Sequence, residues 1–233
     1  MPPAPAAAAP AHDWPAEEPS PSRRPGRSVP ACGAATPAAA APIHALSRTT
    51  PGGQAGRRLA ALNAELLRHH SATAALERWC RAHGASSAAG ARAGVVAFLV
   101  CRADGAPADR RLRLGVGRAV PVRHRRVRLR CGGRVLSEAE NWYVPGRLTP
   151  AMNRLLEETD TPFGRAVRDL RFRRRLLAAE LLWSPAADGQ GAHHPPPYVL
   201  RHHAVLLGPD GRPISEVVET YTRDALFLPQ ARA

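Results

Sequence analysis

The stretch RHRRVRLRCGGRVLSEAENWYVPGRLTPAMNRLLEETDTPFGRAVRDLRFRRR, residues 123–175, decides the fold of this chain. Its first part contains two strand-like runs, VRLRC at 127–131 and RVLSEAENWYVP at 134–145, which are joined by Gly132 and Gly133. Two such runs separated by a Gly-Gly pair are typical of a hairpin with a two-residue turn. The stretch therefore predicts a pair of antiparallel strands.

The first of these strands has two chemically different faces. Because side chains alternate between the two faces of a strand, one face carries Val127, Leu129 and Cys131, and the other carries Arg126, Arg128 and Arg130. A planar guanidinium that is always charged is well suited to hold a carboxylate in a two-point contact. The strand therefore offers candidate anion-binding residues.

The second part of the stretch predicts a helix over 162–175 with an anion site at its start. In the segment DTPFG, residues 160–164, two capping residue types precede a proline at the first helical position. The backbone N–H groups of Phe163 and Gly164 would lie at the positive end of the helix dipole, where a carboxylate or phosphate is favoured. Gly164 leaves room for close approach of a ligand. An ordinary capped helix has the same pattern.

Hydrophobic periodicity extends this architecture along the chain. The other predicted elements are helices at 59–70, 71–84 and 150–158, a strand at 94–102, a loop at 185–197 and a hairpin of 198–208 and 213–223. Ser71 is the predicted cap of the second of these helices. Since helices cluster around hairpins and do not alternate with single strands, we predict an α+β fold with helices packed against an antiparallel sheet.

The chain divides into a tail and one domain. Residues 1–52 are rich in Pro, Ala and Ser and contain few large apolar side chains. Such a segment buries too little surface to offset its ordering entropy, so a disordered tail is predicted there. Residues 53–233 have the size of a single ordinary domain.

Charge and hydropathy limit the partners. All 33 basic residues are arginine, and the formal net charge is +14. This bias favours an Arg- and Ala-rich coding background over a selected polyanion surface, and no nucleic-acid motif accompanies it. No apolar run approaches the length of a membrane span. We therefore expect neither a nucleic acid nor a membrane as partner, and we expect a monomer.

The cysteines and histidines do not form a metal-binding pattern. Cys32, Cys80, Cys101 and Cys131 form no Cys-x-x-Cys pair, which argues against a zinc cage and a dense disulfide framework. Free buried thiols are expected at Cys101 and Cys131, and a reducing cytoplasm fits this pattern. The adjacent histidines His202 and His203 point to opposite faces of a strand, so they do not predict a metal site.

Several of these segments together resemble the chorismate lyase superfamily. The resemblance rests on the order of SAT at 71–73, an Arg-bearing strand, VP at 144–145, TPFGR at 161–165 and VVETY at 217–221. It spans roughly residues 55 to 228. It implies a single domain in which helices and an antiparallel sheet enclose a buried ligand pocket. It also implies cofactor-independent and metal-independent elimination of pyruvate from chorismate to give 4-hydroxybenzoate.

The resemblance also implies site residues. The substrate-binding arginine of the family corresponds to Arg126, with Arg125 and Arg128 as alternatives, and its acidic residue corresponds to Glu219, with Glu216 as the alternative. Further ligand contacts are implied at Ala72, Phe163 and Gly164, where Phe163 replaces a leucine of the family.

Two functions follow from this comparison. The first is a chorismate pyruvate-lyase, in which Arg126 binds a substrate carboxylate and Glu219 contacts the ring hydroxyl and assists proton movement. The second is a non-catalytic domain of the same fold that binds a small aromatic acid. If Arg126 and Glu219 face one buried pocket, the lyase is favoured. If either points to solvent, the binding domain gains.

Overall fold

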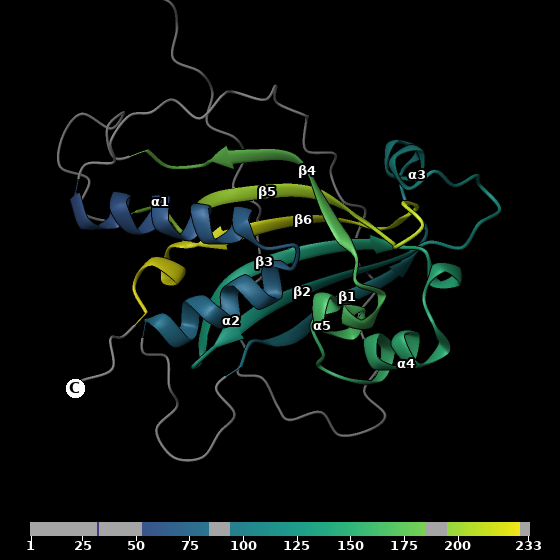
Figure 1. Ribbon diagram of the computed structural model, residues 1–233, viewed down its shortest axis with the longest axis horizontal. Coiled ribbons are helices and arrows are strands. Elements are labelled where there is room, and N and C mark those ends of the chain that lie inside the picture. Colours follow the sequence, from purple (N-terminus) through teal and green to yellow (C-terminus); the bar gives the residue numbers. More distant parts are fainter. Residues whose placement is uncertain (1–31, 33–52, 84–93, 185–194, 229–233) are drawn as a thin grey trace, which may run out of the picture.

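The computed structural model describes residues 53–83, 94–184 and 195–228 together with Cys32, and these residues form an α+β structure around one sheet (Figure 1). The sheet is antiparallel, with the strand order β1-β2-β3-β6-β5-β4. Its strands are β1 (Val96–Asp104), β2 (Arg123–Cys131), β3 (Arg134–Tyr143), β4 (Arg173–Leu181), β5 (Tyr198–Leu207) and β6 (Pro213–Thr222). The predicted fold class is confirmed. Apart from Cys32, the predicted tail 1–52 lies outside the described residues.

Both predicted hairpins are present. The first turns at Gly132 and Gly133, whose φ angles of 55° and 82° lie in the left-handed region that a two-residue hairpin turn requires. In the second, the carboxylate of Asp210 accepts a hydrogen bond of 3.0 Å from the backbone N–H of Arg212. These two tight turns set the antiparallel register of β2 with β3 and of β5 with β6.

Two long helices cover one face of the sheet, which we call the inner face. They are α1 (Gly53–Arg68) and α2 (Ala72–Ala82), and Figure 1 shows both in front of the sheet. The predicted cap Ser71 accepts a hydrogen bond of 3.3 Å from Ala74 N–H, which satisfies a donor at the start of α2. The main core lies beneath these helices and includes Leu62, Leu76 and the inward face of β2.

Shorter helices complete the ends of the sheet. They are α3 (Ala108–Leu114), α4 (Pro150–Glu158), α5 (Phe163–Ala166) and the 3-10 turns η1 (Pro145–Arg147), η2 (Arg168–Leu170) and η3 (Arg223–Leu226). The sequence had not indicated α3, which lies on the opposite, outer face and packs there against β6. No helix within the described ranges combines the length and the apolar composition that a membrane crossing needs.

The predicted helix over 162–175 is wrong. Only four residues are α-helical in α5, and the chain then passes through η2 to Arg171, whose φ of 49° is left-handed and ends the helical path. From Arg173 onward the chain forms β4, which pairs with β5 along its whole length. The hydrogen bonds and side-chain contacts offered by β5 therefore outweigh the local helical pattern, as tertiary context commonly does.

The expectation of a free thiol at Cys101 is also wrong. Cys101 of the edge strand β1 forms a disulfide with Cys32, and the backbone N–H of Cys32 donates a 3.0 Å hydrogen bond to the Arg102 carbonyl. The two cysteines are 69 positions apart, so their spacing concealed this pairing. Cys80 and Cys131 are free and buried, as expected for Cys131. The cysteine pattern therefore no longer supports the expectation of a reducing compartment.

Removing the disulfide should destabilise the protein. A crosslink that closes a loop of this length is expected to contribute about 4 kcal/mol through the entropy of the unfolded chain. We expect a reductant to lower the urea midpoint of the wild-type protein. Cys32→Ser should show this same lowered midpoint whether or not reductant is present. A wild-type midpoint that does not respond to complete reduction would contradict a stabilising role.

Candidate functional site

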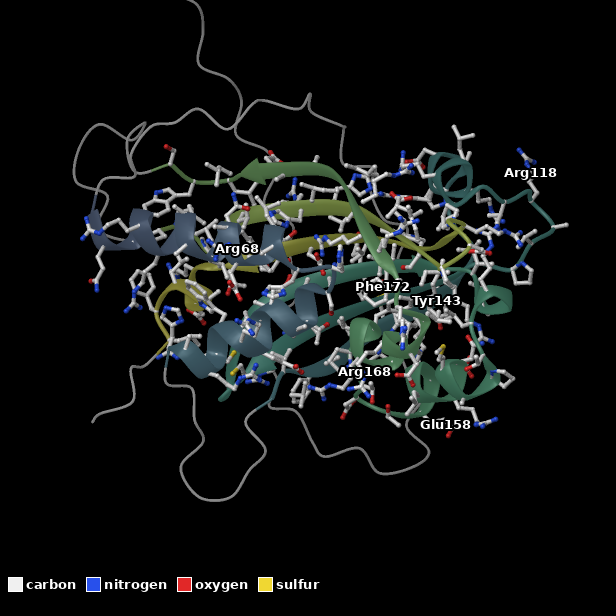
Figure 2. All side chains as sticks on the ribbon, viewed as in Figure 1. Arg68, Arg118, Tyr143, Glu158, Arg168 and Phe172 are labelled. Atoms are coloured by element: carbon white, nitrogen blue, oxygen red, sulfur yellow. A yellow bond between two sulfur atoms is a disulfide. The ribbon has the colours of Figure 1, made fainter. Side chains whose placement is uncertain are left out.

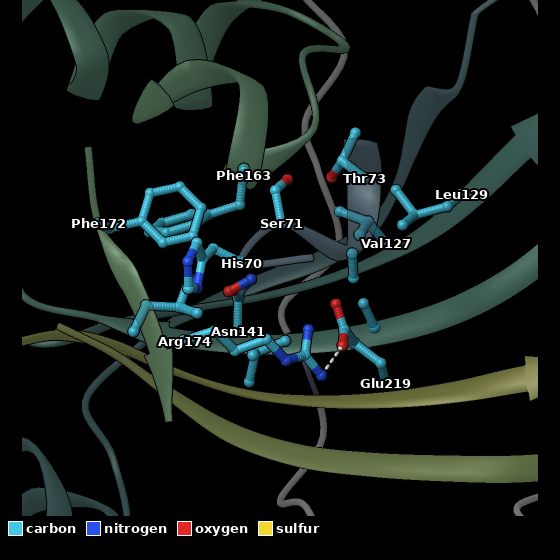
Figure 3. A pocket seen from close by; sticks show the side chains of 15 residues that line it. His70, Ser71, Thr73, Val127, Leu129, Asn141, Phe163, Phe172, Arg174 and Glu219 are labelled. Carbon is cyan, nitrogen blue, oxygen red and sulfur yellow. Dashed lines mark ion pairs between the residues drawn. The ribbon is translucent and has the colours of Figure 1, made fainter. Parts of the chain in front are cut away.

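A pocket lies between the inner face of the sheet and the starts of α2 and α5, and only about 30 Å³ of it is open to water-sized molecules (Figure 3). Much of its wall is apolar and consists of Ala72, Val127, Leu129, Ala139, Phe163, Phe172, Leu206 and Val217. Its polar lining consists of His70, Ser71, Thr73, Asn141, Arg174 and Glu219. An apolar cavity with a few convergent polar groups is the usual form of a small-molecule site.

A buried ion pair lies inside this pocket. The Arg174 guanidinium approaches a carboxylate oxygen of Glu219 to 2.7 Å, and the two side chains are only 6% and 8% exposed (Figure 3). Tyr221 donates a hydrogen bond of 3.1 Å from its hydroxyl to the same carboxylate. Burial, and then the nearby charge of Glu219, raise the pKa of Tyr221 well above its ordinary value, so its hydroxyl keeps the proton that it donates.

A second layer of polar groups supports Arg174. One ring nitrogen of His202, Nδ1, lies 3.5 Å from an Arg174 nitrogen, and the other, Nε2, lies 2.8 Å from Oδ1 of Asn63 on α1. Burial, reinforced by the positive charge of Arg174, lowers the pKa of His202 to about 3. The imidazole is therefore neutral, which allows Nδ1 to accept from Arg174 while Nε2–H donates to Asn63.

Antiparallel register brings together the two members of the ion pair, which lie on different strands of the C-terminal part of the chain. Glu219 lies on β6 directly between Ala139 of β3 and His202 of β5. Arg174 lies on the edge strand β4, where it pairs with Leu206 of β5. The arginine side chain therefore reaches past β5 to meet the carboxylate on β6.

Four of the residues implied by the family resemblance line the pocket. They are Ala72, Phe163, Gly164 and Glu219. Arg126 is not among the lining residues, because it belongs to the other face of β2 from Val127 and Leu129. There its Nε lies 3.1 Å from a carboxylate oxygen of Glu140 on β3. The pocket therefore contains the implied acid, and its cation is Arg174.

The two alternatives to Arg126 have different surroundings. Arg128 is on the same face as Arg126 and pairs with Glu138 at 3.0 Å. Arg125 is on the inner face, where it is 2% exposed and stands opposite Asn141 of β3. It lines a second cavity beside the pocket. The period of two along β2 therefore separates these arginines between two faces.

Glu216 and Glu219 lie on opposite faces of β6, because residues three apart on a strand point to opposite sides. Glu216 is fully buried on the outer face, where its Oε1 accepts hydrogen bonds from Arg110 and from Arg113 at 2.8 Å, and lies 2.5 Å from Nε2 of His203. Burial alone would raise the pKa of Glu216, but the hydrogen bonds to His203, Arg110 and Arg113 hold it below its ordinary value. Glu216 therefore does not contribute to the pocket.

The space around Gly164 is used for packing. A Cβ atom at this position would lie 2.6 Å from Oγ of Ser71 and 3.2 Å from Oγ1 of Thr73, so glycine lets α5 meet the start of α2. In addition, α5 has only four residues and no side-chain cap. The long helix whose dipole was expected to favour an anion at this position is therefore reduced to a single turn. Phe163 takes part through its ring, which packs 5.5 Å from the ring of Tyr143.

The sequence interpretation missed Arg174, Asn141 and Phe172. Arg174 and Phe172 lie in the segment predicted to be helical. Residues two apart do not share a face of a helix, so their spacing did not indicate a common site. As parts of an extended chain, both line the pocket, because residues two apart point the same way. The alternation in FRRRL was therefore the available signal. Among the described residues, no group of three or more His, Cys, Asp or Glu side chains is placed to hold a metal ion.

Comparisons with known proteins give one relative and several partial structural likenesses. The uncharacterized protein y4mC of Sinorhizobium fredii (strain NBRC 101917 / NGR234) is 48% identical over 184 residues, 73% of this chain and 76% of that protein. No family model matches the chain. The ligand-binding domain of a GntR-family transcriptional regulator from Bordetella bronchiseptica has a TM-score of 0.41 and 17% identity, over 59% of this chain and 88% of that one. The effector domain of PhnF from Mycobacterium smegmatis has a TM-score of 0.40 and 19% identity, over 56% and 82%.

The pKa of His202 leads to a prediction about acid stability. The unfolded chain binds a proton at this residue below about pH 6.5, whereas the folded protein binds it only near pH 3. Between these values the free energy of unfolding should fall on acidification, by at most about 1.4 kcal/mol per pH unit from this group. Urea unfolding across this range should give a shallower pH dependence for His202→Gln than for the wild type. His124, whose pKa burial lowers to about 4, is present in both proteins, so the difference isolates His202. Equal slopes would contradict the assignment.

Proposed function

Since the chain belongs to the same family as the uncharacterized protein y4mC, we propose its function from the pocket itself: it binds a small hydroxylated aromatic acid. The observation that carries this proposal is the buried pair of Arg174 and Glu219 in a largely apolar cavity. The apolar wall suits a ring, and the ion pair supplies one donor group and one acceptor group beside it.

The ion pair suits a ligand that carries both a carboxylate and a hydroxyl. A guanidinium has five N–H donors, so Arg174 can hold Glu219 and also donate to a ligand carboxylate. The Glu219 carboxylate has more lone pairs than Tyr221 and Arg174 use, so it can accept a hydrogen bond from a ligand hydroxyl. A simple hydrocarbon would leave this arrangement unused.

Binding a ring requires the pocket to open. Only about 30 Å³ of the pocket is open to a water-sized molecule, and this is far less space than an aromatic acid needs. The lining side chains must therefore move apart when a ligand enters. We expect binding to be accompanied by a change in the near-ultraviolet signal of the aromatic lining residues Phe163 and Phe172 and of neighbouring Tyr143.

Calorimetric titration with 4-hydroxybenzoate tests the binding function. Arg174→Met should weaken binding by roughly tenfold or more, because it removes a charge-assisted hydrogen bond. Its matched control is Arg175→Met, which removes the same charge from an exposed neighbour and should leave affinity within about twofold. If Arg174→Met fails to fold because Glu219 is left buried without its partner, the double variant with Glu219→Gln removes both charges. Equal affinities for wild type, Arg174→Met and the double variant would overturn the proposal.

A second candidate function is elimination of pyruvate from chorismate to give 4-hydroxybenzoate. It is favoured by the position of Glu219, whose carboxylate lies in the pocket beside Arg174. In this proposal Arg174 binds a substrate carboxylate, and Glu219 accepts a hydrogen bond from the ring hydroxyl and assists departure of the ring proton. The reaction needs no cofactor or metal.

A pyruvate-release assay with chorismate distinguishes the two candidates. If the protein is a lyase, wild type should release pyruvate and 4-hydroxybenzoate, and Glu219→Gln should lower kcat by about 100-fold or more, as loss of an acid-base group commonly does. Arg126→Ala should keep most of the activity, since Arg126 pairs with Glu140 away from the pocket. A folded wild type that binds 4-hydroxybenzoate without releasing pyruvate would reject the lyase and retain the binding domain.

A further inference from the structure

A second cavity lies beside the pocket, between β1, β2 and the end of α4. Its lining residues are Arg102, Ala103, Asp104, Arg123, His124, Arg125, Tyr143 and Glu157. About 320 Å³ of it is open to water-sized molecules, so it is wider than the pocket that holds Arg174. We call it the β1–β2–α4 cavity. Neither of the proposed functions uses it.

Three guanidinium groups converge on this cavity, and two of them are held in place by the surrounding structure. Arg102 donates from Nη2 to the carbonyl oxygens of Leu156, at 3.1 Å, and Glu157, which anchors it at the end of α4. Arg125 is 2% exposed and is held in the sheet between β1 and β3. Such preorganised cations lose little side-chain entropy when they bind an anion.

The acidic residues of the cavity balance this charge only in part. Arg123 forms an ion pair with Glu157, while Asp104 lies 3.9 Å from Arg123 with its side chain 93% exposed to solvent. An exposed pair at that distance contributes little. Glu157 is therefore the main negative charge that an entering anion would meet, and it stands next to the cation that the anion would use.

The side chain of Tyr143 completes the lining. Tyr143 is only 3% exposed, and among the described residues its hydroxyl makes no hydrogen bond. A phenol that lines a cavity without a protein partner is a ready donor to a bound anion. The ring of the same tyrosine packs against Phe163 of the neighbouring pocket. The cavity thus holds a donor that the fold itself does not satisfy.

We propose that the β1–β2–α4 cavity is a second anion site and that it binds a phosphate group. Three guanidinium groups and a hydroxyl present more donors than the two oxygens of a monocarboxylate can accept, whereas a phosphate dianion offers three strongly accepting oxygens. Arg125 and Tyr143 form the buried end of the site, and Arg123 forms its entrance. There the Glu157 carboxylate must release Arg123 when the phosphate group enters.

Titration of the full chain with inorganic phosphate tests this site through opposite effects of neighbouring charges. Arg123→Gln should weaken binding roughly tenfold, and Glu157→Gln should strengthen it several-fold because it removes the competing carboxylate. The controls are Arg118→Gln and Glu158→Gln, which make the same charge changes at exposed positions outside the cavity lining (Figure 2). Both controls should stay within about twofold of the wild type.

Tyr143→Phe removes one oxygen without changing the charge and should weaken phosphate binding several-fold. A parallel titration with acetate should give weaker binding than phosphate. The proposal is overturned if phosphate binds no better than acetate. It is also overturned if Arg123→Gln and Glu157→Gln change the affinity for phosphate by the same factor as their controls at Arg118 and Glu158. The second result would show only general attraction of anions to a basic protein. Arg123 is half-exposed and Tyr143→Phe keeps the ring, so circular dichroism should confirm that these variants are folded.

Discussion

Strand β6 carries two carboxylates that are almost completely removed from water, one on each face of the sheet, and each needs cationic partners. Burying an uncompensated carboxylate costs several kcal/mol, on the order of the stability of a whole domain. On the outer face, Glu216 forms ion pairs with Arg110 and Arg113, and these pairs hold α3 against the sheet. On the inner face, Glu219 forms an ion pair with Arg174 of the edge strand β4. The placement of α3 and of β4 is therefore tied to the alternation of side chains along a single strand.

The inner ion pair also shapes the chemistry of the pocket. A guanidinium whose carboxylate partner lies in the same cavity does not create a strong uncompensated field, so it would select the proposed ligand by geometry more than by charge alone. The neutral His202 and the protonated Tyr221 support the pair without adding charge. In the proposed function, a ligand with an acid and a hydroxyl on one ring would place one group beside each member of the pair.

Much of this architecture could be predicted because it depends on short-range patterns. The Gly132-Gly133 turn, the two faces of 127–131 and the cap at Ser71 need only local geometry, and all are confirmed. Separation of Glu216 from Glu219 also follows from the period of two. The segment 162–175 failed because its composition allows both helix and strand, and pairing with β5 decided between them.

The sequence by itself determined the α+β class, the hairpins and the presence of an acidic residue on the inner face of the last hairpin. Those features depend on contacts between residues close in the chain, where turn chemistry and alternation leave few choices. Only the tertiary structure decided that Arg174 and not Arg126 meets Glu219, and that Cys101 pairs with Cys32. Both are meetings of distant segments, set by which strands become neighbours in the sheet. That order is a property of the whole folded chain, because it depends on the burial of all its faces at once.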